Sequence, residues 1–91
     1  MNVRNLSNIK KTLDKILGGR SDANILFNDV CNLLTHPGFD MRIKGSHHIF
    51  RRIDLEEKIN LQRDGNNAKP YQARQVRHII LKYNLGEEIN E

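Results

Sequence analysis

The sequence predicts an α+β fold, a two-layer sandwich in which helices cover one face of a small antiparallel sheet. Apolar residues recur every three or four positions in residues 6–17, 28–36 and 70–83, which is the spacing of amphipathic helices. Between Phe39 and Gln62 the apolar period changes to two, which is typical of half-buried strands. A length of 91 residues fits one domain, so we expect these segments to share one core.

The first expected helix covers residues 6–17, and we interpret it as a docking helix that ends at Gly18-Gly19, where positive φ costs least. It leads into a linker. We therefore divide the chain into an N-terminal helix and linker (1–20), a main domain (21–85) and an acidic tail (86–91) that we expect to be loose. The apolar stripe of the helix consists of Leu6, Ile9, Leu13, Ile16 and Leu17.

The next apolar run, Ile25-Leu26-Phe27, fits either the start of a second helix or an extended lead-in to it. Asn28 is a plausible N-cap, because its side-chain oxygen can accept from a free backbone N–H, and Asp29 suits the positive helix end. Pro37-Gly38 would end the helix. Its apolar stripe consists of Val30, Leu33 and Leu34.

Three strands are expected next, over 39–44, 47–52 and 58–62. Gly45-Ser46 joins the first two as a type II′ turn, which requires glycine at its first central position. We expect a loop over 64–67. A last helix then starts at Pro70, whose missing N–H costs nothing in a first turn, and ends at Leu85-Gly86.

The hairpin turn also predicts which residues share a face of the sheet. With Gly45 and Ser46 in the turn, Lys44 pairs with His47 and Met41 with Phe50, and paired residues lie on the same face. A slip by one residue would bury Lys44 and expose Phe50. The face toward the helices is then expected to carry Met41, Ile43, His48 and Phe50. The uncovered face is expected to carry Arg42, Lys44, His47, Ile49 and Arg51.

Composition excludes several classes of protein. Cys31 is the single cysteine, no Cys/His set has zinc spacing, and no carboxylate cluster suits Mg²⁺, so we expect no disulfide, metal or cofactor. The longest apolar runs have three residues, too short to span a membrane. Polar sequence follows Met1, without the apolar stretch of a signal peptide. We expect a reduced, cytoplasmic protein.

Charge favours a polyanionic partner. The formal net charge is +4, and the pI is about 9.5. Residues 42–52 contain no acid, whereas acids concentrate in residues 54–57 and 87–91. One interpretation is a single basic working surface, and the alternative is a solvated strand pair. The basic and imidazole side chains of this stretch are Arg42, Lys44, His47, His48, Arg51 and Arg52.

His47 is the candidate for chemistry, because it is expected on the uncovered face opposite Lys44. Imidazole takes and gives a proton near neutral pH, and neighbouring cations hold a phosphate. These parts suit cleavage of an RNA phosphodiester by its own 2′-OH, a reaction that requires no metal. From the residues alone, however, a nucleic-acid-binding hairpin without catalysis is favoured. We interpret His48 as structural, His36 as a helix-end residue, His78 as solvent-facing and Cys31 as packing.

The segment Gly45-Ser46-His47-His48-Ile49-Phe50-Arg51 resembles the HicA family, the toxin half of a bacterial toxin–antitoxin pair. The resemblance covers roughly residues 27–85, and Gly-Ser-His-x-x-Phe is its most specific part. The chain departs from the family in the additional helix over 6–17 and in residues 53–57, which lack a Pro/Gly turn. Further resemblance lies in Ile59-Asn60-Leu61, Gly65-Asn66, Lys69-Pro70 and Tyr83-Asn84-Leu85.

The resemblance implies a fold like the double-stranded-RNA-binding domain (dsRBD), α-β-β-β-α, with an extra N-terminal helix. It also implies a ribosome-independent mRNA endonuclease whose catalytic histidine maps onto His47, and a HicB-like antitoxin partner that covers the active site. We expect Lys44 to stabilise the transition state and the other residues to hold RNA. The expected RNA-binding residues are Arg42, Lys44, Ser46, Arg51, Lys69 and Arg74.

Two further functions stay open on the sequence. A non-catalytic RNA-binding module would use the same basic face to recognise RNA shape. A structural subunit that neutralises an acidic protein would also need this charge.

Overall fold

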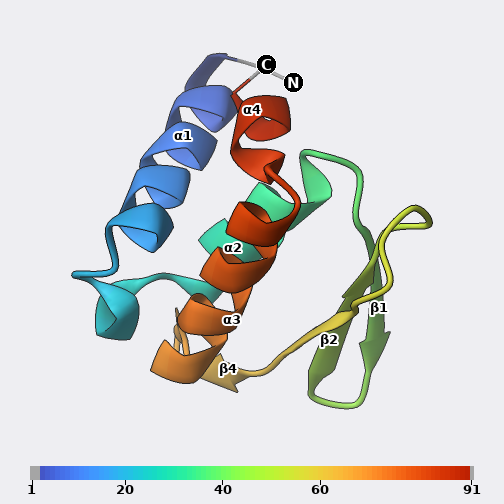
Figure 1. Ribbon diagram of the computed structural model, residues 1–91. Helices are drawn as coiled ribbons and strands as arrows, with labels where there is room; N and C mark the ends of the chain where they lie inside the picture. Colours follow the sequence, from blue (N-terminus) through green and yellow to red (C-terminus); the bar gives the residue numbers. More distant parts are fainter. Residues whose placement is uncertain (1–2, 91) are drawn as a thin grey trace.

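The computed structural model describes residues 3–90 and shows an α+β fold with a small antiparallel sheet, as expected (Figure 1). The helices lie together on one side and the three-stranded sheet projects from the other. Met1, Asn2 and Glu91, which belong to the expected N-terminal segment and tail, lie outside the described residues. The elements are α1 (Val3–Gly18), a 3₁₀ turn (Asp22–Asn24), α2 (Phe27–Thr35), β1 (Asp40–Lys44), β2 (His47–Arg51), β3 (Ile59–Leu61), β4 (Arg63–Asp64), β5 (Asn67–Ala68), α3 (Pro70–Lys82) and α4 (Leu85–Ile89).

The N-terminal helix is confirmed, although it starts at Val3 rather than Leu6. Ile9, Leu13 and Ile16 are buried at helical spacing, and α1 contacts α2, α3 and α4. Leu17, at the end of the expected stripe, is exposed. The helix therefore contributes to the same hydrophobic core as the rest of the chain.

In the ambiguous run at 25–27, Ile25 and Leu26 form an extended lead-in and Phe27 begins the helix. The backbone N–H of Ala68 donates to Ile25, and the N–H of Phe27 donates to Asn66, both at 2.9 Å. These bonds hold the chain extended, so α2 begins at Phe27 with Leu26 as its N-cap. The expectation that Asn28 caps the helix is therefore wrong. Its side-chain oxygen instead accepts from Arg63 at 2.7 Å.

The hairpin register is confirmed at every pair from Asp40↔Arg51 to Lys44↔His47. Gly45 has φ 62°, as the first position of a type II′ turn requires. The strand order is β1-β2-β3, and Phe50 pairs with Ile59. The expected loop at 64–67 is wrong in part, because β4 and β5 form a second small hairpin there.

Two of the four residues expected beneath the helices are not covered. Phe50 is fully buried, but Met41 and Ile43 are 44% and 58% exposed. The reason is the strand order: β1 is an edge strand, and α3 contacts β3 at the other edge. Alternation assigned these two side chains to a face correctly, but the helices do not extend over that part of it.

The chain after α3 is not a loose tail. The last helix ends at Lys82 rather than at Leu85-Gly86, and Asn84, in the left-handed conformation with φ 54°, separates it from the short helix α4. Leu85 and Ile89 are then buried, so the prediction that residues 86–91 are loose is wrong for the described part. Apolar residues four positions apart across Gly86-Glu87-Glu88 carried this signal.

Arg52 links three separate segments of the fold. It donates to both carboxylate oxygens of Asp54, at 2.7 and 2.8 Å, and to Glu88 of α4 at 2.7 Å. It also donates to the carbonyl oxygen of Pro37 at 3.1 Å. The hydrogen bond from Arg52 lowers the pKa of Asp54. Arg52 is therefore neutralised within the fold and does not belong to a free basic surface.

We expect Phe50→Ala to lower the free energy of unfolding by about 3–5 kcal/mol, because it leaves a cavity in the core. Ile43→Ala should lower it by less than about 1 kcal/mol, because its side chain is mostly in water. Urea unfolding followed by circular dichroism measures both, and Phe50→Leu serves if Phe50→Ala does not fold. Equal losses at the two positions would contradict this account of the sheet.

Arg52→Gln should lower the melting temperature at pH 7, and this deficit should shrink as the pH falls. The pKa of Asp54 is depressed below its ordinary value of 3.8, so its contribution is present above that value. It is lost as the pH falls through the depressed pKa. Melting curves from pH 7 to pH 2 test this. Arg51→Gln is the matched control, and any loss of melting temperature that it causes should not change with the protonation of Asp54. A constant Arg52→Gln deficit would contradict the assignment.

Candidate functional site

The candidate site is the side of the sheet that faces away from the helices, called here the outward face. Strand pairing places its members together, since Ile49 pairs with both Arg42 and Asn60, and Lys44 pairs with His47. Ile59 is buried toward the helices, so its neighbour Lys58 lies on the outward face. The outward face consists of Asp40, Arg42, Lys44, His47, Ile49, Arg51, Lys58 and Asn60.

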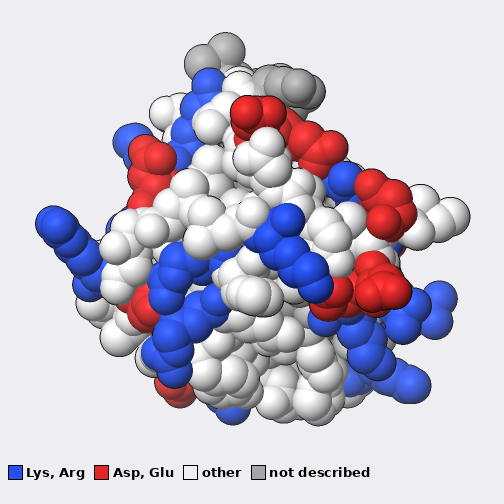
Figure 2. Space-filling model, in the orientation of Figure 1, with Lys and Arg blue, Asp and Glu red and all other residues white. Residues whose placement is uncertain are grey.

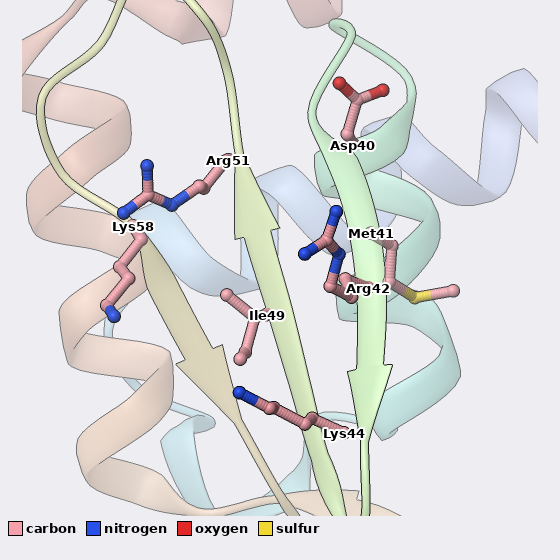
Figure 3. A pocket seen from close by; sticks show the side chains of 7 residues that line it. All are labelled: Asp40, Met41, Arg42, Lys44, Ile49, Arg51 and Lys58. Atoms are coloured by element: carbon pink, nitrogen blue, oxygen red, sulfur yellow. The ribbon is translucent and has the colours of Figure 1, made fainter.

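A shallow hollow of about 640 Å³ lies on this face. In Figure 3, Ile49 lies between Arg42 and Lys44 of β1 on one side and Arg51 and Lys58 on the other, whereas Met41 points away. Four cations and one carboxylate line the hollow, so its local charge is strongly positive. The lining residues are Asp40, Met41, Arg42, Lys44, Ile49, Arg51 and Lys58.

His47 stands beside this hollow at the end of the hairpin rather than within its lining. Its side chain is exposed, as the register predicted. The ring Nδ1 lies 2.9 Å from Oδ1 of Asn60 on β3. The structure thus brings an imidazole, its cross-strand partner Lys44 and a hydrogen-bonding amide onto one exposed surface.

The neighbouring Ser46 is exposed in the turn and is also held from the third strand. Its Oγ accepts a hydrogen bond from Nε2 of Gln62 at 3.1 Å. Ser46 and His47, both at the tip of the hairpin, therefore contact amide side chains from the centre of β3 and from the residue that follows it.

His48 lies on the opposite face, as predicted. Its ring meets the ring of Phe27 edge-on, with centroids 4.8 Å apart. Its Nδ1 is buried without a hydrogen-bond partner. This placement fits a packing role under the helices. Cys31 is half-buried, and burial raises the pKa of its thiol to about 11, which disfavours the reactive thiolate.

Two residues expected to bind RNA lie away from the outward face. Lys69 is the N-cap of α3, and its backbone N–H donates to Gln72 at 3.3 Å. Arg74 is exposed on α3. Because α3 belongs to the helical layer, these two residues are not members of the outward face, and their expected role in RNA binding stays a prediction.

Sequence reasoning missed three polar residues of the third strand region: Lys58, Asn60 and Gln62. The signal was present, because they alternate with Ile59 and Leu61, whose burial directs the polar set outward. The irregular connection over 52–58 concealed how this strand pairs with the hairpin.

Acidic side chains gather elsewhere. Figure 2 shows them mainly over α4 and the connection between β2 and β3, in the upper and right-hand parts of the view. Asp54 and Glu88 in these segments pair with Arg52, and Glu57 pairs with Lys82 at 3.1 Å. These three acids therefore pair with cations other than the four of the outward face, and Arg52 belongs to these pairs.

No protein-family model, curated protein or solved structure matched the chain. Within residues 3–90, no helix is long and apolar enough to cross a membrane. Among the described side chains, no three His, Cys, Asp or Glu groups lie close enough together to hold a metal ion.

Proposed function

We propose that this protein is a HicA-type toxin, an endoribonuclease that cleaves mRNA without a metal and is inhibited by a HicB-like antitoxin. One observation carries the proposal: an exposed imidazole, His47, stands at the tip of a hairpin beside four cations of the same sheet face. The Gly-Ser-His-x-x-Phe segment that resembles the family supplies this imidazole.

In the proposed reaction, His47 acts first as a base and then as an acid. It takes the proton of the 2′-OH, whose oxygen attacks the adjacent phosphorus, and then gives that proton to the departing 5′-oxygen. Lys44, which pairs with His47 across the strands, supplies a positive charge that offsets the charge on the phosphorane oxygens. Arg42 and Arg51 hold neighbouring phosphates. The products are a 2′,3′-cyclic phosphate and a 5′-OH.

The element order α2, β1, β2, β3, α3, with the small β4–β5 hairpin inserted before α3, is compatible with the dsRBD-like fold that this function implies. The proposed antitoxin would cover the outward face, where Ile49 offers a half-buried apolar contact among cations. The exposed Met41 and Ile43 on the edge strand extend the apolar surface available to such a partner.

We expect His47→Ala to lower the rate of RNA cleavage by about 10²–10⁴-fold and leave RNA affinity nearly unchanged, because only the proton transfer is lost. Labelled mRNA incubated with pure protein in EDTA, with analysis of the product ends, measures the rate. His78→Ala, which removes an exposed histidine of α3, is the control and should cleave like the wild type. Absence of cleavage by the wild-type protein, or equal cleavage by His47→Ala, would contradict the proposal.

A non-catalytic RNA-binding module is the second candidate, because the same four cations favour it. Binding through four phosphates predicts a slope of about −3 in a plot of log affinity against log salt for single-stranded RNA. Arg42→Gln and Arg51→Gln should each make the slope shallower by about 0.7. Fluorescence anisotropy measures this, with Lys10→Gln on α1 as the control that should change nothing. Binding with this slope but without cleavage would favour the module.

A further inference from the structure

Asn60 is a residue of the outward face that the proposed chemistry has not yet used. It pairs with Ile49 on β2, two residues beyond His47, so Asn60 and His47 are diagonal neighbours on the same face. The 2.9 Å contact from its Oδ1 reaches Nδ1 of the imidazole and leaves Nε2 outside this bond.

We propose that Asn60 is a positioning residue that fixes His47 in the neutral tautomer with its proton on Nδ1. An amide oxygen accepts hydrogen bonds and does not donate them, so this contact requires an N–H at Nδ1. The lone pair of the neutral ring then lies on Nε2. Free imidazole side chains prefer the opposite tautomer, with the proton on Nε2, so a specific partner is needed to reverse that preference.

The consequence, which rests on the proposed nuclease function, is that Nε2 is the atom that exchanges protons with RNA. When Nε2 takes the 2′-OH proton, the ring becomes an imidazolium and Nδ1 keeps its own proton. The bond to Asn60 therefore persists in both protonation states and holds the ring plane while the proton moves to the 5′-oxygen. The hydrogen bond to Asn60 therefore determines both which ring nitrogen acts as the base and how the ring plane is oriented.

The third-strand region is suited to this task because it holds the hairpin tip at two points. Gln62 donates to Ser46 and the side chain of Asn60 contacts His47, so the turn and the imidazole are both held by the same neighbouring chain segment. Ile59 and Leu61, which flank Asn60, are fully buried and anchor the strand that carries it. An amide on a strand that is anchored by buried neighbours orients the ring better than one on a loop.

The tautomer is measured directly by ¹⁵N NMR of the imidazole nitrogens in the free protein. We expect the wild type to show the Nδ1–H form at His47. Asn60→Ala should revert toward the Nε2–H form, whereas Asn60→Asp, which keeps an acceptor oxygen, should retain Nδ1–H. Asn60→Val, a residue suited to strands, serves as a second variant without an acceptor if Asn60→Ala does not fold. An Nε2–H form in the wild type would overturn the proposal.

Gln62→Ala is the matched control, because it removes the other amide contact at the hairpin tip and leaves Asn60 in place. Its His47 tautomer should match the wild type. In RNA cleavage, Asn60→Ala should be slower by about 3–10-fold, the usual range for one exposed hydrogen bond, with RNA affinity unchanged. A tautomer change in Gln62→Ala equal to that in Asn60→Ala would contradict a specific role for Asn60.

The tautomer measurement and the cleavage measurement distinguish a failure of this proposal from a failure of the proposed nuclease function. The tautomer is read without RNA, so an Nδ1–H form that depends on Asn60 supports the positioning role even if the protein cleaves no RNA. Conversely, cleavage that depends on His47 but not on Asn60 would leave the nuclease intact and overturn the positioning role.

Discussion

The cross-strand register of the β1–β2 hairpin determines which side chains lie on the outward face of the sheet and which face the helices. His47 and His48 are adjacent in the chain, so a shift of one residue would exchange the exposed imidazole with the one packed on Phe27. Two independent constraints oppose that shift. Gly45 takes the positive φ that the tight turn requires, and Phe50 fills a fully buried position that a slip would empty. Turn chemistry and core burial therefore select the same imidazole for the solvent.

Features determined by neighbours along the chain could be predicted from the sequence, and features determined by distant packing could not. The hairpin pairs and the three long helices follow from periodicity and from a two-residue turn. The exposure of Ile43 does not, because it depends on which strands the helices cover. The docking of α4 likewise depends on Leu85 and Ile89 entering the core and on Arg52 meeting Glu88, 36 positions away.

The same distinction applies to the residues of the candidate site. His47, Lys44 and Arg42 could be placed because one short turn relates them. Alternation with Ile59 and Leu61 indicates which face the third-strand residues share, but the sequence does not indicate their neighbours on β2, because the connection over 52–58 has no regular turn to define the pairing of β2 with β3. As a result, Asn60, which contacts His47 directly, was recognisable only once the pairing Ile49↔Asn60 was known.

The carboxylates that form ion pairs lie away from the outward face, so the positive charge of that face is not neutralised by them. Among the described residues, the ion pairs involve Arg52, Arg77 and Lys82, which link loops and helices, and none involves the four cations of the outward face. The acids thus neutralise cations with structural roles and leave the outward face positive. A net charge of +4 understates the field above that face, because most of the balancing acids lie elsewhere. If the proposed RNA substrate binds this protein, the positive outward face would favour its approach on the side that displays His47.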